Sequence, residues 1–204
     1  MSPSFFEWWF SPWNNVDKSW DILRSNGDIL AQRDGYRMWC AKADVTPSLP
    51  VLYDDLWTEV MTDDPDLLLN SARLFIGIIA ACEHNQVILH SLTPDARRWC
   101  VSVAATQPLL FLCKATYLES DSIEIHGLVE FAARLNCGFP GLWSRLRLLL
   151  PALLANRVSK LLESGLDITR YSSSSKTRSK RCWRLCVIQY EMNVENAPNW
   201  KNYE

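Results

Sequence analysis

Apolar residues recur at helical spacing in two long stretches of the chain, residues 64–82 and 123–138. At about 100° per residue, one side of each stretch collects the apolar side chains, which predicts two amphipathic helices with a buried face. The predicted structural core takes three residues from each stretch, namely Leu68, Phe75, Ile79, Leu128, Phe131 and Leu135.

The polar positions of the second stretch follow the same repeat. His126, Glu130 and Arg134 recur every fourth residue on the side away from Phe131, and Glu130 precedes Arg134 in the favourable orientation for an ion pair. We therefore expect this side of the helix to face water. Gly138, with a proline shortly after it, predicts where the helix ends.

Proline marks the first turn of four predicted helices, because its missing N–H loses no hydrogen bond there. Asp64 stands before the first of these prolines as a predicted N-cap, and Thr93 to Asp95 form a second start signal. The three later helices are predicted over residues 94–106, 107–118 and 151–165.

The remaining segments are less regular. Residues 1–62 are rich in aromatic residues and broken by prolines, with short helices predicted near residues 16–24 and 35–43. Residues 171–181 are basic and low in apolar residues, which predicts a flexible linker. Residues 182–190 are the single strand candidate, because β-branched and aromatic residues gather there.

These patterns predict an all-α fold, a mainly helical single domain with a flexible basic tail. The expected division is a helical domain over residues 1–170, with an aromatic-rich part at 1–62 and a helical core at 63–166, followed by a basic linker and C-terminal tail at 171–204. With 204 residues and 48% hydrophobic content, such a domain can form a core without disulfides or metals.

Composition points to a cytosolic protein. The formal charge of -2 and a pI near 5.9 argue against general nucleic-acid binding. Seven cysteines at irregular spacing are typical of reduced thiols. The N-terminus carries no signal-peptide pattern, and the longest apolar run, Leu74–Cys82, is too short to span a bilayer.

No arrangement of residues predicts catalysis. Cys82, His84, His90 and Cys100 match no usual zinc spacing, and the chain has no nucleophile elbow and no phosphate-binding glycine loop. We therefore expect no enzymatic activity, no metal, no cofactor and no small-molecule substrate.

Two surfaces are candidates for binding macromolecules. Among the ten tryptophans, Trp8, Trp9 and Trp13 cluster near the N-terminus and predict a docking surface for a protein. Arg145 and Arg147 are further interface candidates, with Arg145 better placed for a buried or interfacial ion pair. Residues 145–150 fit either a helix or an extended segment.

The alternative surface would bind nucleic acid. Arg97 and Arg98 lie just behind a predicted helix start, and a basic run extends from Lys176 to Arg184. Solvated surface charge is the favoured interpretation, because Asp95 shares the helix start and the protein is acidic overall.

Several of these patterns together resemble the SctK family of type III secretion proteins, also called YscK, OrgA or MxiK. The resemblance rests on F-S-P at Phe10–Pro12, on L-L-L-N-S-A-R-L-F-I-G-I-I-A, and on I-E-I-H-G-L-V-E-F-A-A-R-L followed by R-L-R-L-L-L-P. It covers residues 5–162, and the basic tail has no counterpart in it.

The resemblance implies a non-enzymatic structural adaptor of the cytoplasmic sorting platform, at the base of an injectisome. Members of that family connect the cytoplasmic domain of the inner-membrane ring protein, SctD, to the pod protein, SctQ, and through it to SctL and the ATPase. It further implies a cytoplasmic location peripheral to the inner membrane, with contact to the membrane only through the ring. The alternative is a helical regulatory or nucleic-acid-binding protein that uses Arg97, Arg98 and the basic tail.

Overall fold

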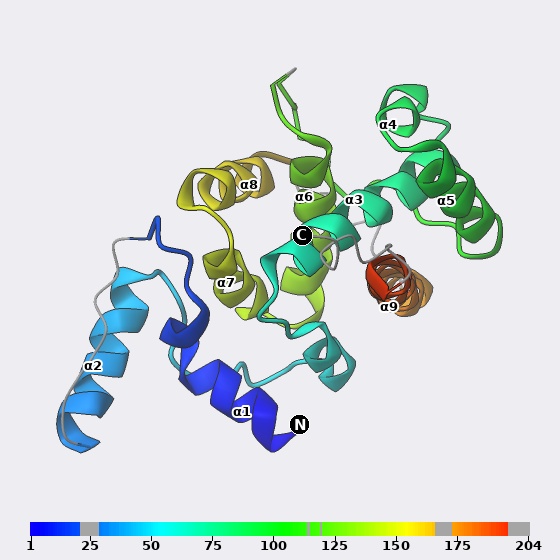
Figure 1. Cartoon of the computed structure of the whole chain (residues 1–204). Coiled ribbons are helices and arrows are strands. Elements are labelled where there is room, and N and C mark those ends of the chain that lie inside the picture. The colour runs from blue at the N-terminus through cyan, green and yellow to red at the C-terminus, as the bar shows by residue number, and fades with distance from the viewer. Residues whose placement is uncertain (21–28, 114, 119, 166–172, 196–204) are drawn as a thin grey trace, which may run out of the picture.

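Helix α3 (Pro65–Cys82) occupies the centre of the fold in this computed structural model (Figure 1). Its start is the predicted one, because the Asp64 side chain accepts hydrogen bonds from the N–H groups of Asp66 and Leu67. The helices that pack most extensively on α3 are α5 (Pro94–Thr106), α6 (Ile123–Gly138) and α9 (Ser173–Glu195).

The structure describes residues 1–20, 29–113, 115–118, 120–165 and 173–195, and it contains no strand within them. The all-α prediction is thereby confirmed. The other elements are α1 (Pro3–Phe10), η1 (Pro12–Asn15), α2 (Ile29–Lys42), η2 (Asp55–Val60), α4 (Gln86–His90), α7 (Leu142–Leu146), η3 (Arg147–Leu149) and α8 (Ala152–Gly165). Of the helix predicted near residues 16–24, residues 16–20 form no helix, so that part of the prediction is wrong, and residues 21–24 lie outside the described part.

All six predicted core residues, three on α3 and three on α6, are fully buried. They belong to one large hydrophobic cluster that also takes in residues of α1, α7, α8 and α9. A second, smaller cluster joins α2 to η3 and comprises Trp39, Cys40, Ala43, Val45 and Leu148.

The predicted linker and strand at residues 171–190 are wrong over the described residues, since residues 173–195 form helix α9. Cys182, Trp183 and Cys186 are buried on its inner side. Trp183 stacks on Phe131 of α6 with ring centroids 3.4 Å apart. The apolar positions 182, 183 and 186 have helical spacing, and α3 and α6 supply the apolar surface that they cover.

The helix predicted over residues 107–118 is also wrong, because the described residues between α5 and α6 form no helix. Glu130 of α6 accepts hydrogen bonds from the backbone N–H groups of Leu112, at 2.9 Å, and Cys113, at 2.8 Å. These backbone groups therefore bond to a side chain instead of to a helical turn.

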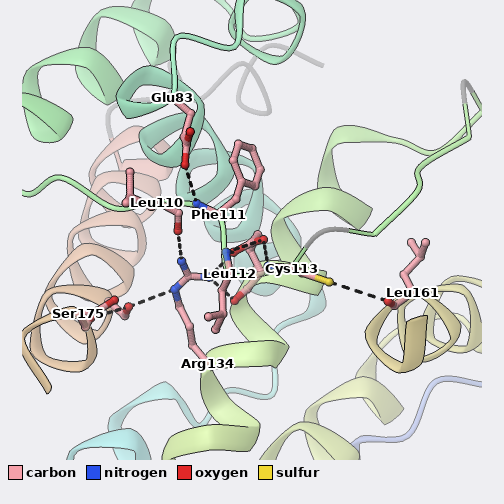
Figure 2. A network of polar contacts seen from close by, with 10 residues as sticks. Glu83, Leu110, Phe111, Leu112, Cys113, Arg134, Leu161 and Ser175 are labelled. Atoms are coloured by element: carbon pink, nitrogen blue, oxygen red, sulfur yellow. Dashed lines mark hydrogen bonds and ion pairs between the residues drawn. The ribbon is translucent and has the colours of Figure 1, made fainter. Parts of the chain in front are cut away.

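Glu130 and Arg134 consequently lie in the interior and not, as predicted, beside water; both are at most 1% exposed. They form an ion pair with each other. Arg134 also donates to the Leu110 carbonyl at 2.7 Å and to Ser179 of α9 at 3.1 Å. Figure 2 shows this network, in which α6 holds both the 107–113 segment and α9.

The alternative left open at residues 145–150 is resolved in favour of a helix. Helix α7 runs into the 3₁₀ turn η3, and only Leu150 has an extended backbone. The predicted end of α6 at Gly138 is confirmed. Gly138 has no positive φ, so the left-handed conformation expected there is absent; the lack of a side chain instead leaves room for Trp57, whose Nε1 would lie 2.2 Å from an added Cβ.

Candidate functional site

Helix α1 carries aromatic residues on two neighbouring sides, about 100° apart. Its first turn is capped by Ser2, whose Oγ accepts a hydrogen bond from the N–H of Phe5. Phe5 and Trp9, four residues apart, are buried against Phe139, with ring centroids 5.8 and 5.5 Å away. This inner side fixes α1 on the end of α6.

The outer side of α1 exposes Phe6 and Phe10, which are 41% and 42% accessible to solvent. Their rings are almost parallel, with an interplanar angle of 2° and centroids 6.5 Å apart. Phe10 also contacts Tyr36 of α2, at 6.0 Å between ring centroids. We refer to Phe6 and Phe10 as the α1 aromatic face.

The predicted tryptophan surface needs correction. Trp9 is fully buried and offers no surface to a partner. Trp8 and Trp13 are half-buried, and Trp13 packs edge-on against Tyr36 and Trp39. The tryptophans face inward because their large rings fill the space between α1, α2 and α6, so the phenylalanines are the ones left outside.

Arg145, predicted to form a buried or interfacial ion pair, is 3% exposed and contacts α1. Its guanidinium lies 3.6 Å from the centroid of the Trp9 ring, and its Nε donates to the Trp9 carbonyl at 3.2 Å. Its Nη2 donates to the Tyr36 hydroxyl at 3.2 Å and to the Thr46 carbonyl at 2.9 Å. One side chain on α7 thus ties together α1, α2 and the connector that follows α2.

No carboxylate pairs with Arg145 within the described part of the chain. The Arg145 guanidinium instead stacks on the Trp9 indole and donates through Nε and Nη2, while its buried Nη1 has no hydrogen-bond partner among the described residues. The predicted buried ion pair at Arg145 is therefore wrong there, and carbonyl oxygens and an indole take the place of an acid.

Arg147 has the same role one step further along the chain. It is 8% exposed, and its Nη2 donates to the carbonyls of Ala43, at 2.9 Å, and Asp44, at 3.3 Å. The Asp44 carboxylate lies 3.4 Å away, but its side chain is almost fully exposed, so this pair is weak. Arg145 and Arg147 are therefore not exposed for docking. Both hold the connector that follows α2, through the carbonyls of residues 43, 44 and 46.

Burial sets the protonation of the groups around Arg145. Burial raises the pKa of Tyr36 to about 12, with the nearby Arg145 charge opposing that rise. The Tyr36 hydroxyl thus stays protonated at neutral pH and donates to the Pro47 carbonyl at 2.6 Å. Burial likewise lowers the pKa of Arg145 and raises that of the Cys40 thiol.

Four of the cations proposed for nucleic-acid binding are engaged within the chain, namely Arg97, Arg98, Lys180 and Arg184. Arg97 donates to the carbonyls of Leu89 and Leu92 around the end of α4. Arg98 pairs with Asp95 on the exposed side of α5. On α9, Lys180 pairs with Asp54 and Arg184 lies 3.8 Å from Glu59.

The remaining polar residues do not assemble into a reactive centre in the part of the chain that the structure describes. No three His, Cys, Asp or Glu side chains come together there to hold a metal ion. The seven thiols are free, and burial raises the pKa of Cys100 and of Cys182 to about 12, so both are poor nucleophiles at neutral pH.

Helix α3 meets the length and hydropathy expected of a membrane-spanning helix. The central helix of a bundle meets the same criterion, and α3 has ten buried residues and contacts α5, α6 and α9. Its apolar circumference is therefore explained by packing inside the fold.

Phe6 and Phe10 were not part of the predicted docking surface, because that prediction followed the enrichment of tryptophan in interfaces. The available signal was the spacing of four residues, which puts Phe6 and Phe10 on one side of a helix and Phe5 and Trp9 on the neighbouring side. Sequence alone did not say which pair faces inward.

No family model, no curated protein and no solved structure matches this chain.

Proposed function

We propose that this protein is a non-enzymatic helical adaptor that binds a protein partner through the α1 aromatic face. The observation that carries the proposal is a pair of exposed, parallel phenylalanines on a helix whose neighbouring side is anchored. Aromatic side chains are enriched among the residues that dominate protein interfaces. A single exposed aromatic side chain is common on protein surfaces and does not indicate binding. An aligned pair on a fixed helix, in contrast, presents a defined apolar contact.

Rigid support makes this surface suitable for binding. Arg145 holds the α1 backbone at the Trp9 carbonyl and the Trp9 ring at the same time. A surface whose backbone is already fixed loses less conformational freedom when a partner binds, so more of the contact energy appears as affinity.

In its specific form, the proposal follows from the resemblance to the SctK family. The partners would be the cytoplasmic domain of the ring protein SctD and the pod protein SctQ, with SctL and the ATPase further along. The adaptor would then work in the cytoplasm at the base of the secretion apparatus and support effector secretion. The helical content and the solvent-exposed aromatic face are compatible with such a scaffold.

The test is co-purification of the full chain with an SctD cytoplasmic domain and with SctQ from the same genome. We expect the double variant Phe6→Ser/Phe10→Ser to lose partner binding by about 30-fold or more, the effect of removing a hot spot of about 2 kcal/mol. Its melting temperature should stay close to that of the wild type, because both rings are already in contact with water.

Val87→Ser on α4 is the matched control, since Val87 is 83% exposed and lies outside α1. It should leave binding intact. Failure of the wild-type chain to bind either partner would remove the secretion assignment. Binding to DNA or RNA that falls steeply with salt would favour the nucleic-acid alternative, since phosphate contacts release counterions.

A further inference from the structure

A groove of about 480 Å³ runs between α9 and η2. Its base is apolar and is formed by Trp57, Val60, Trp183 and Val187. Leu56 of η2 and Ile188 of α9 stand at its borders, with 58% and 41% of their surface exposed. Apolar side chains on both borders of an apolar groove indicate that another element can be buried there.

One stripe of α9 borders this groove and has an asymmetric charge. Arg181, Arg184, Ile188 and Glu191 follow one another at intervals of three, four and three residues, which places them on one side of the helix. The two arginines lie in the first part of the stripe and the glutamate at its end. Ten residues separate Arg181 from Glu191, a distance of about 15 Å along a helix.

The end charges of the stripe are not neutralised inside the chain. Arg184 lies 3.8 Å from Glu59, and both side chains are largely exposed, so this contact is weak. Arg181 and Glu191 are exposed and form no ion pair with any residue that the structure describes. The groove therefore presents a positive charge at one end and a negative charge at the other.

We propose that the occupant of this groove is α9 of a second copy of the same chain, in antiparallel orientation about a twofold axis. In that arrangement the same surface serves both copies, and α9 of each lies in the groove of the other. The twofold axis crosses the stripe midway between Arg181 and Glu191. Arg181 then meets Glu191 of the second copy, and Glu191 meets its Arg181.

The apolar contacts follow from the same axis. Arg184 of each copy lies opposite Ile188 of the other, where its aliphatic stem can cover the isoleucine while the guanidinium stays in water. A second copy is favoured over an unrelated helix because both members of the required charge pair are present on α9 itself. The contact area is limited to one helix and one 3₁₀ turn on each copy, so the association is weak and concentration-dependent.

The test is the mass of the full chain in solution, measured by light scattering at about 10 and about 300 µM, a range suited to small interfaces. We expect the mass to rise with concentration from 23.5 kDa toward twice that value. Arg181→Glu or Glu191→Arg alone should weaken association by about tenfold, because each brings like charges together. The combined variant Arg181→Glu/Glu191→Arg should restore it, since the pairing is then reversed in both contacts.

Lys160→Glu is the control, because Lys160 is an exposed cation on α8 outside the groove. It should dimerise like the wild type. A chain that stays monomeric at both concentrations overturns the proposal, as does a dimer that the combined variant fails to restore. A different protein occupies the groove if two results occur together. The wild type would be monomeric and capture SctD or SctQ, and Ile188→Asp would melt normally but lose that capture. Because none of these residues lies on α1, loss of self-association leaves the proposed adaptor function standing.

Discussion

At the scale of single residues, Glu130 and Arg134 show how one spacing can fit two environments. Their i,i+4 relation forms the ion pair whether or not water is present. The cost of burying the two charges is offset because they make further hydrogen bonds. Glu130 accepts from the N–H groups of Leu112 and Cys113, and Arg134 donates to the Leu110 carbonyl. An incomplete network at this depth would cost more than an apolar pair.

We expect Glu130→Ala to be strongly destabilising, because it leaves Arg134 as a buried charge and two backbone N–H groups without an acceptor. Breaking a buried pair costs about 3 to 5 kcal/mol, which for a chain of this length corresponds to about 6 to 20 °C in melting temperature. Thermal unfolding followed by circular dichroism measures the change.

The control for Glu130→Ala is Asp95→Ala, which breaks an ion pair whose two side chains are at least 80% exposed. Such pairs contribute little, so the melting temperature should hardly move. Equal losses for the two variants would show that Glu130 is not part of an interior network.

At the scale of elements, the crossing of α3 and α6 depends on Gly127. A Cβ at this position would lie 2.0 Å from the Ala72 carbonyl oxygen, so only glycine permits the two helices to approach so closely. The close crossing brings the apolar sides of α3 and α6 together, and α9 completes the arrangement by stacking Trp183 on Phe131.

Gly127→Ala should therefore destabilise the fold by about 1 to 3 kcal/mol, the usual cost of overpacking a core. Alanine is the better helix former by about 1 kcal/mol, so propensity alone predicts the opposite sign. The free energy of unfolding measured in urea distinguishes the overpacking prediction from the propensity prediction.

Ser102→Ala, on the exposed side of α5, is the control, and it should change that free energy by less than about 0.5 kcal/mol. A stabilising Gly127→Ala would contradict the close crossing.

At the scale of the whole molecule, polar contacts far apart in sequence join the peripheral elements to the α3–α6 centre. Arg145 secures α1 and α2, Arg134 secures α9, and Arg157 of α8 binds Asp121, just before α6, through two hydrogen bonds. Protonation of such groups alters the stability of the fold as a whole.

Acid should weaken the protein in two steps. Burial lowers the pKa of His126 below 6.5, with Asp121 opposing, so the unfolded chain binds more protons and stability falls as pH drops below 6.5. Hydrogen bonds from Arg157 hold the pKa of Asp121 below 3.8, and that contribution is lost as pH falls through the folded-state pKa.

The measurement is the urea midpoint at pH 7 and pH 5.5. His126→Phe should reduce the difference between the two, because phenylalanine keeps the stacking on Tyr117 but cannot take up a proton. His90→Gln, at an exposed position, should leave the difference unchanged. A wild-type difference that persists fully in His126→Phe would assign the acid sensitivity to other groups.

Much of the fold was predictable from local patterns. The start of α3 at Asp64 and Pro65, the course of α5, and the buried side of α6 all follow from caps and apolar spacing within a few turns. Of the candidate site, the presence of an aromatic cluster near the N-terminus was predictable. Its exposed members were not, because Phe5 and Phe6 are adjacent and alike, and only Phe139 determines which of them is covered.

The sequence by itself thus determined where α3, α5, α6 and α8 begin, six residues of the core and that the fold is all-α. The tertiary structure decided that residues 107–113 are not helical, that residues 173–195 are, and that Glu130, Arg134, Arg145 and Arg147 are buried. The physical reason is distance along the chain. Caps and helical spacing act within a few residues, whereas the partners of these four side chains and the surface that α9 covers come from segments that only folding brings together.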